Sequence, residues 1–125
     1  MASLERLGEG CKDNGLLFSI HAHMWTTIIP LIFNGTDEQK KRFLPGLVAG
    51  TLIGANAMSE PNSGSDAFSL ATTAVKKGDK YILNGSKIFV TNGPIADVLL
   101  AFPATDKRKG TAGVSAFLVE RNSAG

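Results

Sequence analysis

A stretch of small polar residues at positions 57–66 has the residue types that could contact a bound ligand. It combines serine hydroxyls, an asparagine amide and two acids with Pro61 and Gly64. Such a loop can present backbone N–H groups and hydroxyls to phosphate oxygens or to a flat polar ring. Gly64 would let the backbone come close, and Pro61 would limit the freedom of the loop. Taken alone, a turn of this composition is usually only a turn, and the sequence has neither a Walker motif nor a G-x-G-x-x-G fingerprint.

A second segment, residues 84–93, places an aromatic ring near a hydroxyl. We expect a strand at residues 87–91, in which alternation puts Phe89 and Thr91 on one face. An aromatic ring beside a hydroxyl on one face can wall and orient a flat heterocycle. For the segment alone, a core aromatic residue beside an edge threonine is the more ordinary interpretation.

The elements that must position these segments differ between the two parts of the chain. Up to about residue 47 the pattern predicts helices. The first helix covers residues 3–12, and Asp13 or Asn14 caps the next one. We expect Pro30 to end or kink this second helix, because proline lacks a backbone donor. Thr36 and Gln39 form a capping box for a short third helix, which we expect to stop before Pro45.

From residue 51 onward, β-branched residues and turn signals predict short strands. Asn84-Gly85 is a strong hairpin dipeptide, and Gly78-Asp79 marks another turn. The predicted strands cover residues 52–58, 70–76, 81–83, 87–91, 97–104 and 114–120. We therefore expect an α+β fold, with a helical segment followed by a small antiparallel β-barrel or sandwich. The expected division is residues 1–50 and residues 51–125.

Composition narrows the classes of partner. The net charge is +2 and the basic residues are scattered, so we expect no nucleic-acid partner. Cys11 is the single cysteine, which excludes an internal disulfide and fits a reducing compartment. The apolar run at residues 16–33 contains polar residues and a proline, so we expect a buried core helix and no membrane span.

Several motifs in order and spacing resemble the acyl-CoA dehydrogenase family over nearly the whole chain. After the capping box come Ser59-Glu60-Pro61, Gly64-Ser65-Asp66, Asn84-Gly85, Thr91-Asn92-Gly93 and Ala116-Phe117-Leu118-Val119-Glu120. The resemblance implies the end of an N-terminal helical domain plus most of a middle β domain. In that family FAD lies in a cleft between the middle domain and a C-terminal helical bundle. A carboxylate base takes the α proton of a fatty-acyl-CoA, and hydride passes to flavin N5.

The resemblance also implies which residues contact the cofactor. They are Asn56, Met58, Ser59, Ser65, Phe89 and Thr91. Ser65 would also lie near the acyl-CoA substrate. Ser59 stands where threonine is commoner, and Phe89 stands where tryptophan is frequent. The first keeps the hydroxyl, and the second keeps an aromatic wall without the indole N–H.

No catalytic residue is expected within this chain. The resemblance places the catalytic glutamate in a C-terminal bundle beyond position 125, and it indicates that Glu60 and Asp66 shape the loop. His21 and His23 are two positions apart, so they do not form the i, i+4 pair of a helical metal site. We expect both to be core or edge histidines, and we expect no metal site.

Two hypotheses of function remain open from the sequence. The chain is either the FAD-binding portion of an acyl-CoA dehydrogenase or a non-catalytic remnant that self-associates or binds another chain. An acyl-CoA oxidase or a flavin monooxygenase of similar architecture is a close third. We expect a homo-oligomer in the cytoplasm, or in the mitochondrial matrix if the source is eukaryotic.

Overall fold

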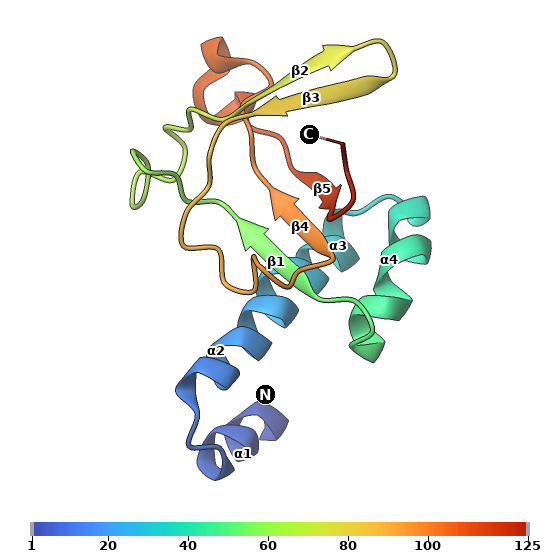
Figure 1. Ribbon diagram of the computed structural model, residues 1–125, viewed down its shortest axis with the longest axis vertical. Coiled ribbons are helices and arrows are strands. Elements are labelled where there is room, and N and C mark those ends of the chain that lie inside the picture. The colour runs from blue at the N-terminus through green and yellow to red at the C-terminus, as the bar shows by residue number, and fades with distance from the viewer. Residues whose placement is uncertain (1, 125) are drawn as a thin grey trace.

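The computed structural model describes residues 2–124, with helices first and strands afterwards (Figure 1). The predicted α+β class is confirmed. Met1 and Gly125, the outer ends of the two predicted divisions, lie outside the described residues. The elements are α1 (Ala2–Gly10), α2 (Asn14–His23), the π-helical turn η1 (Met24–Ile28), α3 (Ile29–Asn34), α4 (Asp37–Ala49), β1 (Gly54–Ala57), β2 (Thr73–Lys77), β3 (Lys80–Asn84), β4 (Val98–Ala101), the 3-10 segment η2 (Lys107–Gly113) and β5 (Phe117–Glu120).

The segments α2, η1 and α3 form one uninterrupted helix. Asp13 caps it, as predicted, because its side chain accepts a hydrogen bond from the Leu16 N–H at 3.0 Å. Pro30 does not end the helix. It follows a π turn in which the Ile29 N–H bonds to the Met24 carbonyl, five residues back. The wider turn accommodates Pro30, which has no backbone N–H to donate.

Helix α4 begins as predicted and ends later than predicted. The Thr36 and Gln39 capping box is present in both directions. The predicted stop before Pro45 is wrong, because α4 continues through it to Ala49 and closes at Gly50, whose φ is 73°. The added turn buries Leu47, which is 1 % exposed. Burial of that side chain outweighs the one hydrogen bond that proline removes.

The strands form two small sheets and, within the described residues, no closed barrel. One sheet has the order β1-β4-β5; β1 and β4 are parallel, whereas β4 and β5 are antiparallel. The hairpin β2–β3 stands apart at the top of Figure 1. It joins the rest through Ala104, which accepts a hydrogen bond from the Ala74 N–H at 2.9 Å. The first sheet is therefore mixed, because a long crossover between β1 and β4 lets them run in the same direction.

The predicted strand at residues 87–91 is wrong. This stretch is irregular, and Phe89 has a φ of 53°. The Asn84-Gly85 dipeptide also does not form the hairpin turn, which instead falls at Gly78-Asp79 as the second turn signal indicated. Gly85 packs so closely on residue 72 that an added Cβ would lie 2.6 Å from the Thr72 Cα. The glycine is needed there for close approach rather than for a turn.

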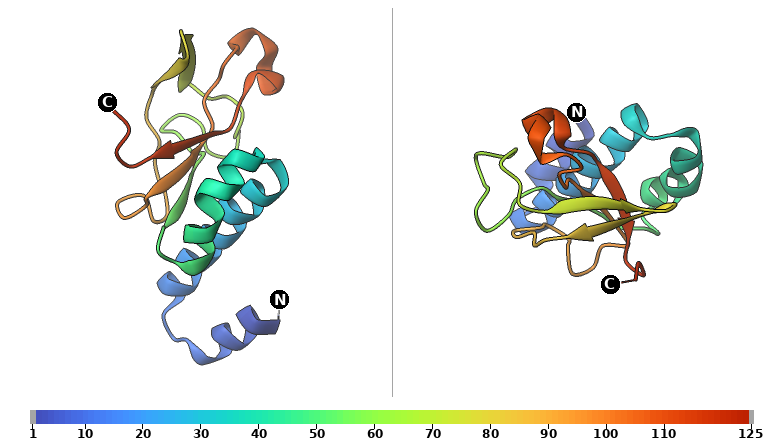
Figure 2. Two further views of the ribbon diagram at one scale, coloured as in Figure 1. Left: turned by 90° about the vertical axis from the view of Figure 1, so that its right-hand side faces the viewer. Right: turned by 90° about the horizontal axis from the view of Figure 1, so that it is seen from above.

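The long helix packs between α4 and the first sheet (Figures 1 and 2). Their shared core consists of Ile28, Leu31, Phe43, Leu47 and Val98. Among the described residues, one helical stretch, Asn14–Asn34, is long and apolar enough to cross a membrane, a test that core helices of soluble proteins also pass. Its Ile28 and Leu31 pack in the protein core, whereas Phe18 and Phe33 are 66 % and 75 % exposed, so the expected buried helix is buried on one side only.

Candidate functional site

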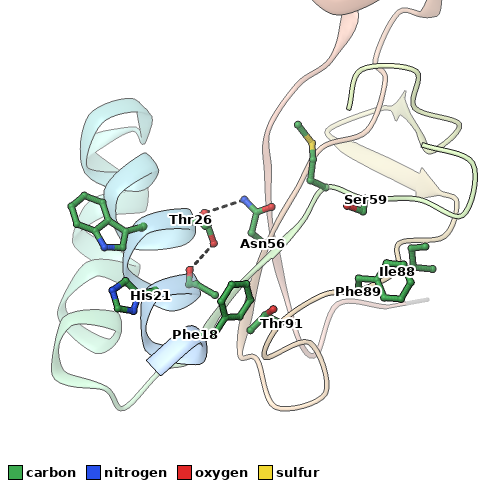
Figure 3. A pocket seen from close by; sticks show the side chains of 11 residues that line it. Phe18, His21, Thr26, Asn56, Ser59, Ile88, Phe89 and Thr91 are labelled. Atoms are coloured by element: carbon green, nitrogen blue, oxygen red, sulfur yellow. Dashed lines mark hydrogen bonds between the residues drawn. The ribbon is translucent and has the colours of Figure 1, made fainter. Parts of the chain in front are cut away.

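A pocket of about 300 Å³ opens between the long helix and the ends of the strands (Figure 3). The helix supplies one wall. The end of β1 and the irregular segment before β4 supply the other. Its lining consists of Phe18, His21, Ala22, Trp25, Thr26, Asn56, Met58, Ser59, Ile88, Phe89 and Thr91. Five of the six predicted ligand contacts therefore lie around one cavity.

Asn56 joins the two walls of the pocket. It lies in β1, and its side-chain amide donates a hydrogen bond to the Thr26 carbonyl at 3.1 Å. Thr26 in turn donates from its hydroxyl to the Ala22 carbonyl at 2.5 Å, as the dashed lines in Figure 3 mark. The strand is thus tied to the helix at the π turn. This link fixes where the backbone leaves β1 toward Met58 and Ser59.

Ser59 and Thr91 bring unused hydrogen-bond donors to the pocket. Within residues 2–124, neither hydroxyl and neither backbone N–H of these two residues bonds to the protein. The Ser59 carbonyl, by contrast, accepts a hydrogen bond from the Ile88 N–H at 2.9 Å. Partly buried donors without partners are suited to a ligand that carries acceptors. A flavin ring has ring nitrogens and carbonyl oxygens, so this donor set fits it.

Phe89 is both exposed and conformationally strained. Its side chain is 91 % exposed. Its φ of 53° places a bulky residue in the left-handed region, which L-residues avoid. The alternation that predicted its place beside Thr91 does not exist, yet both residues line the pocket. Strain of this kind concentrates at functional sites, where the surrounding structure holds it in place.

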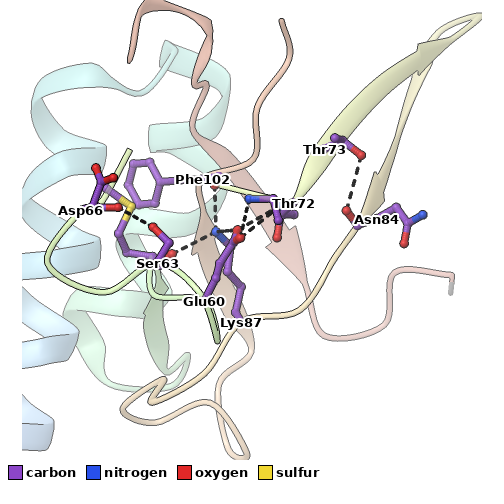
Figure 4. Close-up of polar contacts among 10 residues, drawn as sticks. Glu60, Ser63, Asp66, Thr72, Thr73, Asn84, Lys87 and Phe102 are labelled. Carbon is purple, nitrogen blue, oxygen red and sulfur yellow. Dashed lines mark hydrogen bonds and ion pairs between the residues drawn. The ribbon is translucent and has the colours of Figure 1, made fainter. Parts of the chain in front are cut away.

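Glu60, which follows Ser59 in the sequence, forms a buried ion pair with Lys87 (Figure 4). Lys87 Nζ donates to Glu60 Oε1 at 2.8 Å, and the carboxylate also accepts from the Ala71 and Thr72 N–H groups. Burial alone would raise the pKa of Glu60, but the hydrogen bonds from Lys87 and from these amides outweigh it and lower the pKa from 4.5 to about 2. A carboxylate held in this way is a poor proton acceptor at neutral pH.

Ser65, the sixth predicted contact, does not line the pocket. It lies exposed on the loop that follows Glu60. Ser63, two residues earlier, is buried, and its hydroxyl donates to the Asp66 carbonyl. The loop is therefore anchored by Ser63 and leaves Ser65 accessible. Its contacts with cofactor and substrate remain a prediction.

Sequence reasoning missed the helical wall of the pocket. It treated His21 as a core or edge residue, whereas His21 lines the cavity and its Nδ1 lies 2.7 Å from the Leu17 carbonyl. Phe18 and Trp25 lie on the same side. The signal was present in the sequence, because positions 18, 21 and 25 follow helical spacing. It was obscured by the apolar stripe on the other face of the same helix.

His23 lies away from this pocket and is fully used by the protein. Its Nδ1 accepts a hydrogen bond from the Gly54 N–H at 2.9 Å. Nε2 therefore carries the proton and donates to the Leu47 carbonyl, also at 2.9 Å. This side chain joins the long helix, α4 and β1 at one point.

Comparison with known proteins matches two family models. The model described as acyl-CoA dehydrogenase, N-terminal domain, matches residues 1–51, and the model described as acyl-CoA dehydrogenase, middle domain, matches residues 55–125. The curated acyl-CoA dehydrogenase of Bacillus subtilis is 49 % identical over 89 % of this chain and 29 % of its own length. The chain thus spans about a third of the length of the relatives that it matches.

Two solved structures show the same arrangement. The prolyl acyl carrier protein oxidase AnaB superposes with a TM-score of 0.92 at 50 % identity, covering 95 % of this chain and 32 % of that one. The FAD complex of PigA superposes with a TM-score of 0.92 at 48 % identity, covering 95 % of this chain and 31 % of that one. The second structure contains the cofactor whose acceptor groups fit the donor set described above.

Proposed function

Since this chain belongs to the acyl-CoA dehydrogenase family, whose members use FAD, we propose that its pocket holds the isoalloxazine ring of that cofactor. The observation that carries the proposal is that one pocket is lined by Ser59 and Thr91, whose hydrogen-bond donors are unused, and by the exposed ring of Phe89, whose backbone is strained. In the whole protein, the site would serve the α,β-dehydrogenation of an acyl thioester. FAD, when bound, supplies the two-electron acceptor for that reaction.

Each of the six predicted contact residues has a proposed contribution. Ser59 and Thr91 donate hydrogen bonds to the polar edge of the ring and favour the negative charge that reduction places there. Phe89 packs against the ring as an aromatic wall. Asn56 and Met58 shape the adjoining backbone, and Ser65 extends the site toward the remaining part of the cofactor and the substrate thioester.

The proton acceptor of the reaction is not assigned to the acids of this loop. Glu60 is already committed to Lys87 and two amides, with its pKa lowered to about 2. Asp66 lies on the exposed part of the loop, away from the lining of the pocket. We propose that a carboxylate outside the described residues acts as the base.

The substrate class is an acyl thioester. We propose a fatty-acyl-CoA, with the apolar helical wall of Phe18, Ala22 and Trp25 facing the acyl portion. A thioester on a carrier protein is the second candidate, because AnaB acts on prolyl acyl carrier protein and is 50 % identical to this chain. The reacting thioester is the same in both cases, so the pocket chemistry serves either.

The setting of the protein is also a proposal. The single thiol, Cys11, fits a reducing compartment, and we propose a cytoplasmic homo-oligomer. A non-catalytic, self-associating module is the alternative to an enzyme. Retention of flavin by the chain would favour the enzyme, because a remnant has no need of the cofactor.

The test is flavin retention by the 125-residue chain. The purified chain is loaded with FAD and desalted, and the bound flavin is measured by its absorption band. We expect a retained and perturbed band, weakened in the double variant Ser59→Ala with Thr91→Ala and unchanged in Ser123→Ala, an exposed hydroxyl outside the pocket. Wild-type chain that retains no flavin would overturn the proposal. Comparing the rates at which the whole protein oxidises acyl-CoA and prolyl carrier protein then distinguishes the two candidate substrates.

A further inference from the structure

We propose that Lys87 is a positioning residue for the flavin site. Its ammonium group, together with Glu60, holds the backbone that carries Ser59 and the backbone that carries Phe89 at a fixed spacing. This inference rests on the proposed flavin site and deepens it, because it assigns a function to a side chain that lies outside the pocket lining.

The ammonium group of Lys87 makes three hydrogen bonds, as many as it has donors. Nζ donates to the Met58 carbonyl at 3.0 Å, to Glu60 Oε1 at 2.8 Å and to the Phe102 carbonyl at 2.9 Å (Figure 4). These acceptors come from the end of β1, from the loop after it and from the segment after β4. One side chain therefore joins two segments that are distant in the sequence, residues 58–60 and the segment after β4, to its own.

Glu60 extends the same connection to the start of the hairpin. Its Oε2 accepts from the Ala71 N–H at 2.6 Å, and its Oε1 accepts from the Thr72 N–H at 3.1 Å. The Glu60 side chain is 3 % exposed and that of Lys87 is 13 % exposed. Charges at such depth are retained only where partners satisfy them, and here every donor of Lys87 has one.

The connection reaches the pocket through neighbouring residues. Lys87 bonds to the Met58 carbonyl, and the next residue, Ile88, bonds to the Ser59 carbonyl at 2.9 Å. Two consecutive residues of the irregular segment are thus fastened to two consecutive residues that follow β1, and these two segments together form the pocket wall opposite the helix. Phe89 follows directly, in its left-handed conformation. Loss of the Lys87 contacts removes one of the restraints that oppose relaxation of Phe89 toward the negative φ that a bulky residue prefers.

A positioning role differs from simple stabilisation in what it predicts. A buried ion pair contributes little net stability compared with apolar residues of the same shape, so a matched apolar replacement can keep the fold. What the apolar replacement cannot reproduce is the set of directional hydrogen bonds to Met58 and Phe102. Flavin affinity and the flavin potential should therefore change in a variant that remains folded.

The experiment compares Lys87→Met, Glu60→Gln and the double variant Lys87→Met with Glu60→Met in the full chain. The control is Arg42→Met, which removes the exposed ion pair with Glu120. We expect folded double variant by circular dichroism, FAD affinity reduced about tenfold or more, and a shifted flavin midpoint potential. The control should match the wild type. A folded double variant with wild-type affinity and potential would overturn the proposal.

Amide hydrogen exchange in the absence of FAD separates this inference from the proposed function. We expect exchange at the Ile88 amide, which donates to the Ser59 carbonyl, to accelerate in the Lys87 variants and to stay unchanged in the Arg42 variant. If the wild-type chain retains no flavin but this acceleration is seen, the proposed function fails and the fastening by Lys87 stands. If exchange at the Ile88 amide is the same in all variants, the positioning role of Lys87 is wrong.

Discussion

Ser19 and Asn92 exchange two hydrogen bonds although they lie 73 positions apart: the Ser19 hydroxyl donates to Asn92 Oδ1 at 2.5 Å, and Asn92 Nδ2 donates to the Ser19 carbonyl at 3.1 Å. The same amide approaches the Gly54 carbonyl at 3.4 Å. Asn92 therefore fastens the segment before β4 to the long helix. It holds the neighbouring Thr91 near the helical wall of the pocket.

Two replacements of Asn92 should distinguish the stability contributed by its side-chain hydrogen bonds from the stability contributed by its tolerance of a left-handed backbone. Its φ is 66°, a conformation that asparagine and glycine tolerate. Asn92→Gly removes the hydrogen bonds without straining the backbone, so we expect a loss of about 1–2 kcal/mol in the free energy of unfolding. Asn92→Ala should cost roughly 1 kcal/mol more, because alanine is strained there. Urea denaturation measures both; equal losses would contradict the argument. Ser19→Ala, which removes one bond, should cost less than either.

The lowered pKa of Glu60 predicts that the folded chain loses stability as the pH falls. Its pKa is lowered from 4.5 to about 2 in the folded chain, so its contribution is complete above pH 4.5 and is lost as the pH falls toward 2. The integrated loss is roughly 3 kcal/mol. Glu60→Gln should be less stable than the wild type at neutral pH, and the difference should shrink as the pH falls. Glu9→Gln, an exposed carboxylate on α1, is the control and should stay near the wild type throughout.

Phe89 should show opposite effects on stability and on cofactor binding. Phe89→Gly relieves the strain of a φ of 53°, so we expect the chain without FAD to gain about 1 kcal/mol relative to Phe89→Ala, which keeps the strain. Both variants lose the aromatic wall, and FAD affinity should fall roughly fivefold to tenfold in each. Phe89→Trp should keep the affinity. Thermal unfolding and flavin titration measure the two effects; a glycine variant no more stable than the alanine variant would contradict the strain.

Gly54 should be intolerant of a side chain. A Cβ there would lie 2.6 Å from Thr27 Cγ2 and 2.9 Å from Thr27 Cβ, and Thr27 is completely buried. Gly54→Ala must push β1 away from the π turn and stretch the bond from the Gly54 N–H to His23, so we expect a loss of about 1–3 kcal/mol. Gly8→Ala is the matched control in α1, where an added Cβ meets no atom within 4 Å. It should gain about 0.5–1 kcal/mol.

Local signals in the sequence predicted local structure well. The Asp13 cap, the capping box of Thr36 with Gln39 and the turn at Gly78-Asp79 each depend on residues within four positions of one another, and each is present. The family resemblance placed Asn56, Met58, Ser59, Phe89 and Thr91, which the pocket brings together.

The predictions that were wrong share one cause, which is contact between residues distant in the sequence. Residues 87–91 look like a strand, but the bonds of Lys87 to Met58 and Phe102 hold them in an irregular path. Pro45 looks like a helix stop, but burial of Leu47 continues α4. The helical wall of the pocket was missed because the same helix also carries a core stripe, and only the fold decides which neighbour each face meets.

The π turn at Met24–Ile28 rotates the two halves of the long helix relative to each other, so that each half presents a different face to its surroundings. Before it, Phe18 and His21 face the pocket; after it, Leu31 faces the core. Removing one residue within the turn would restore an ordinary α-helix and rotate one half against the other by about 100°. The pocket face would then turn away while the core contacts with α4 stayed in place. The single surplus residue is thus what allows one helix to line the pocket and to pack in the protein interior at once.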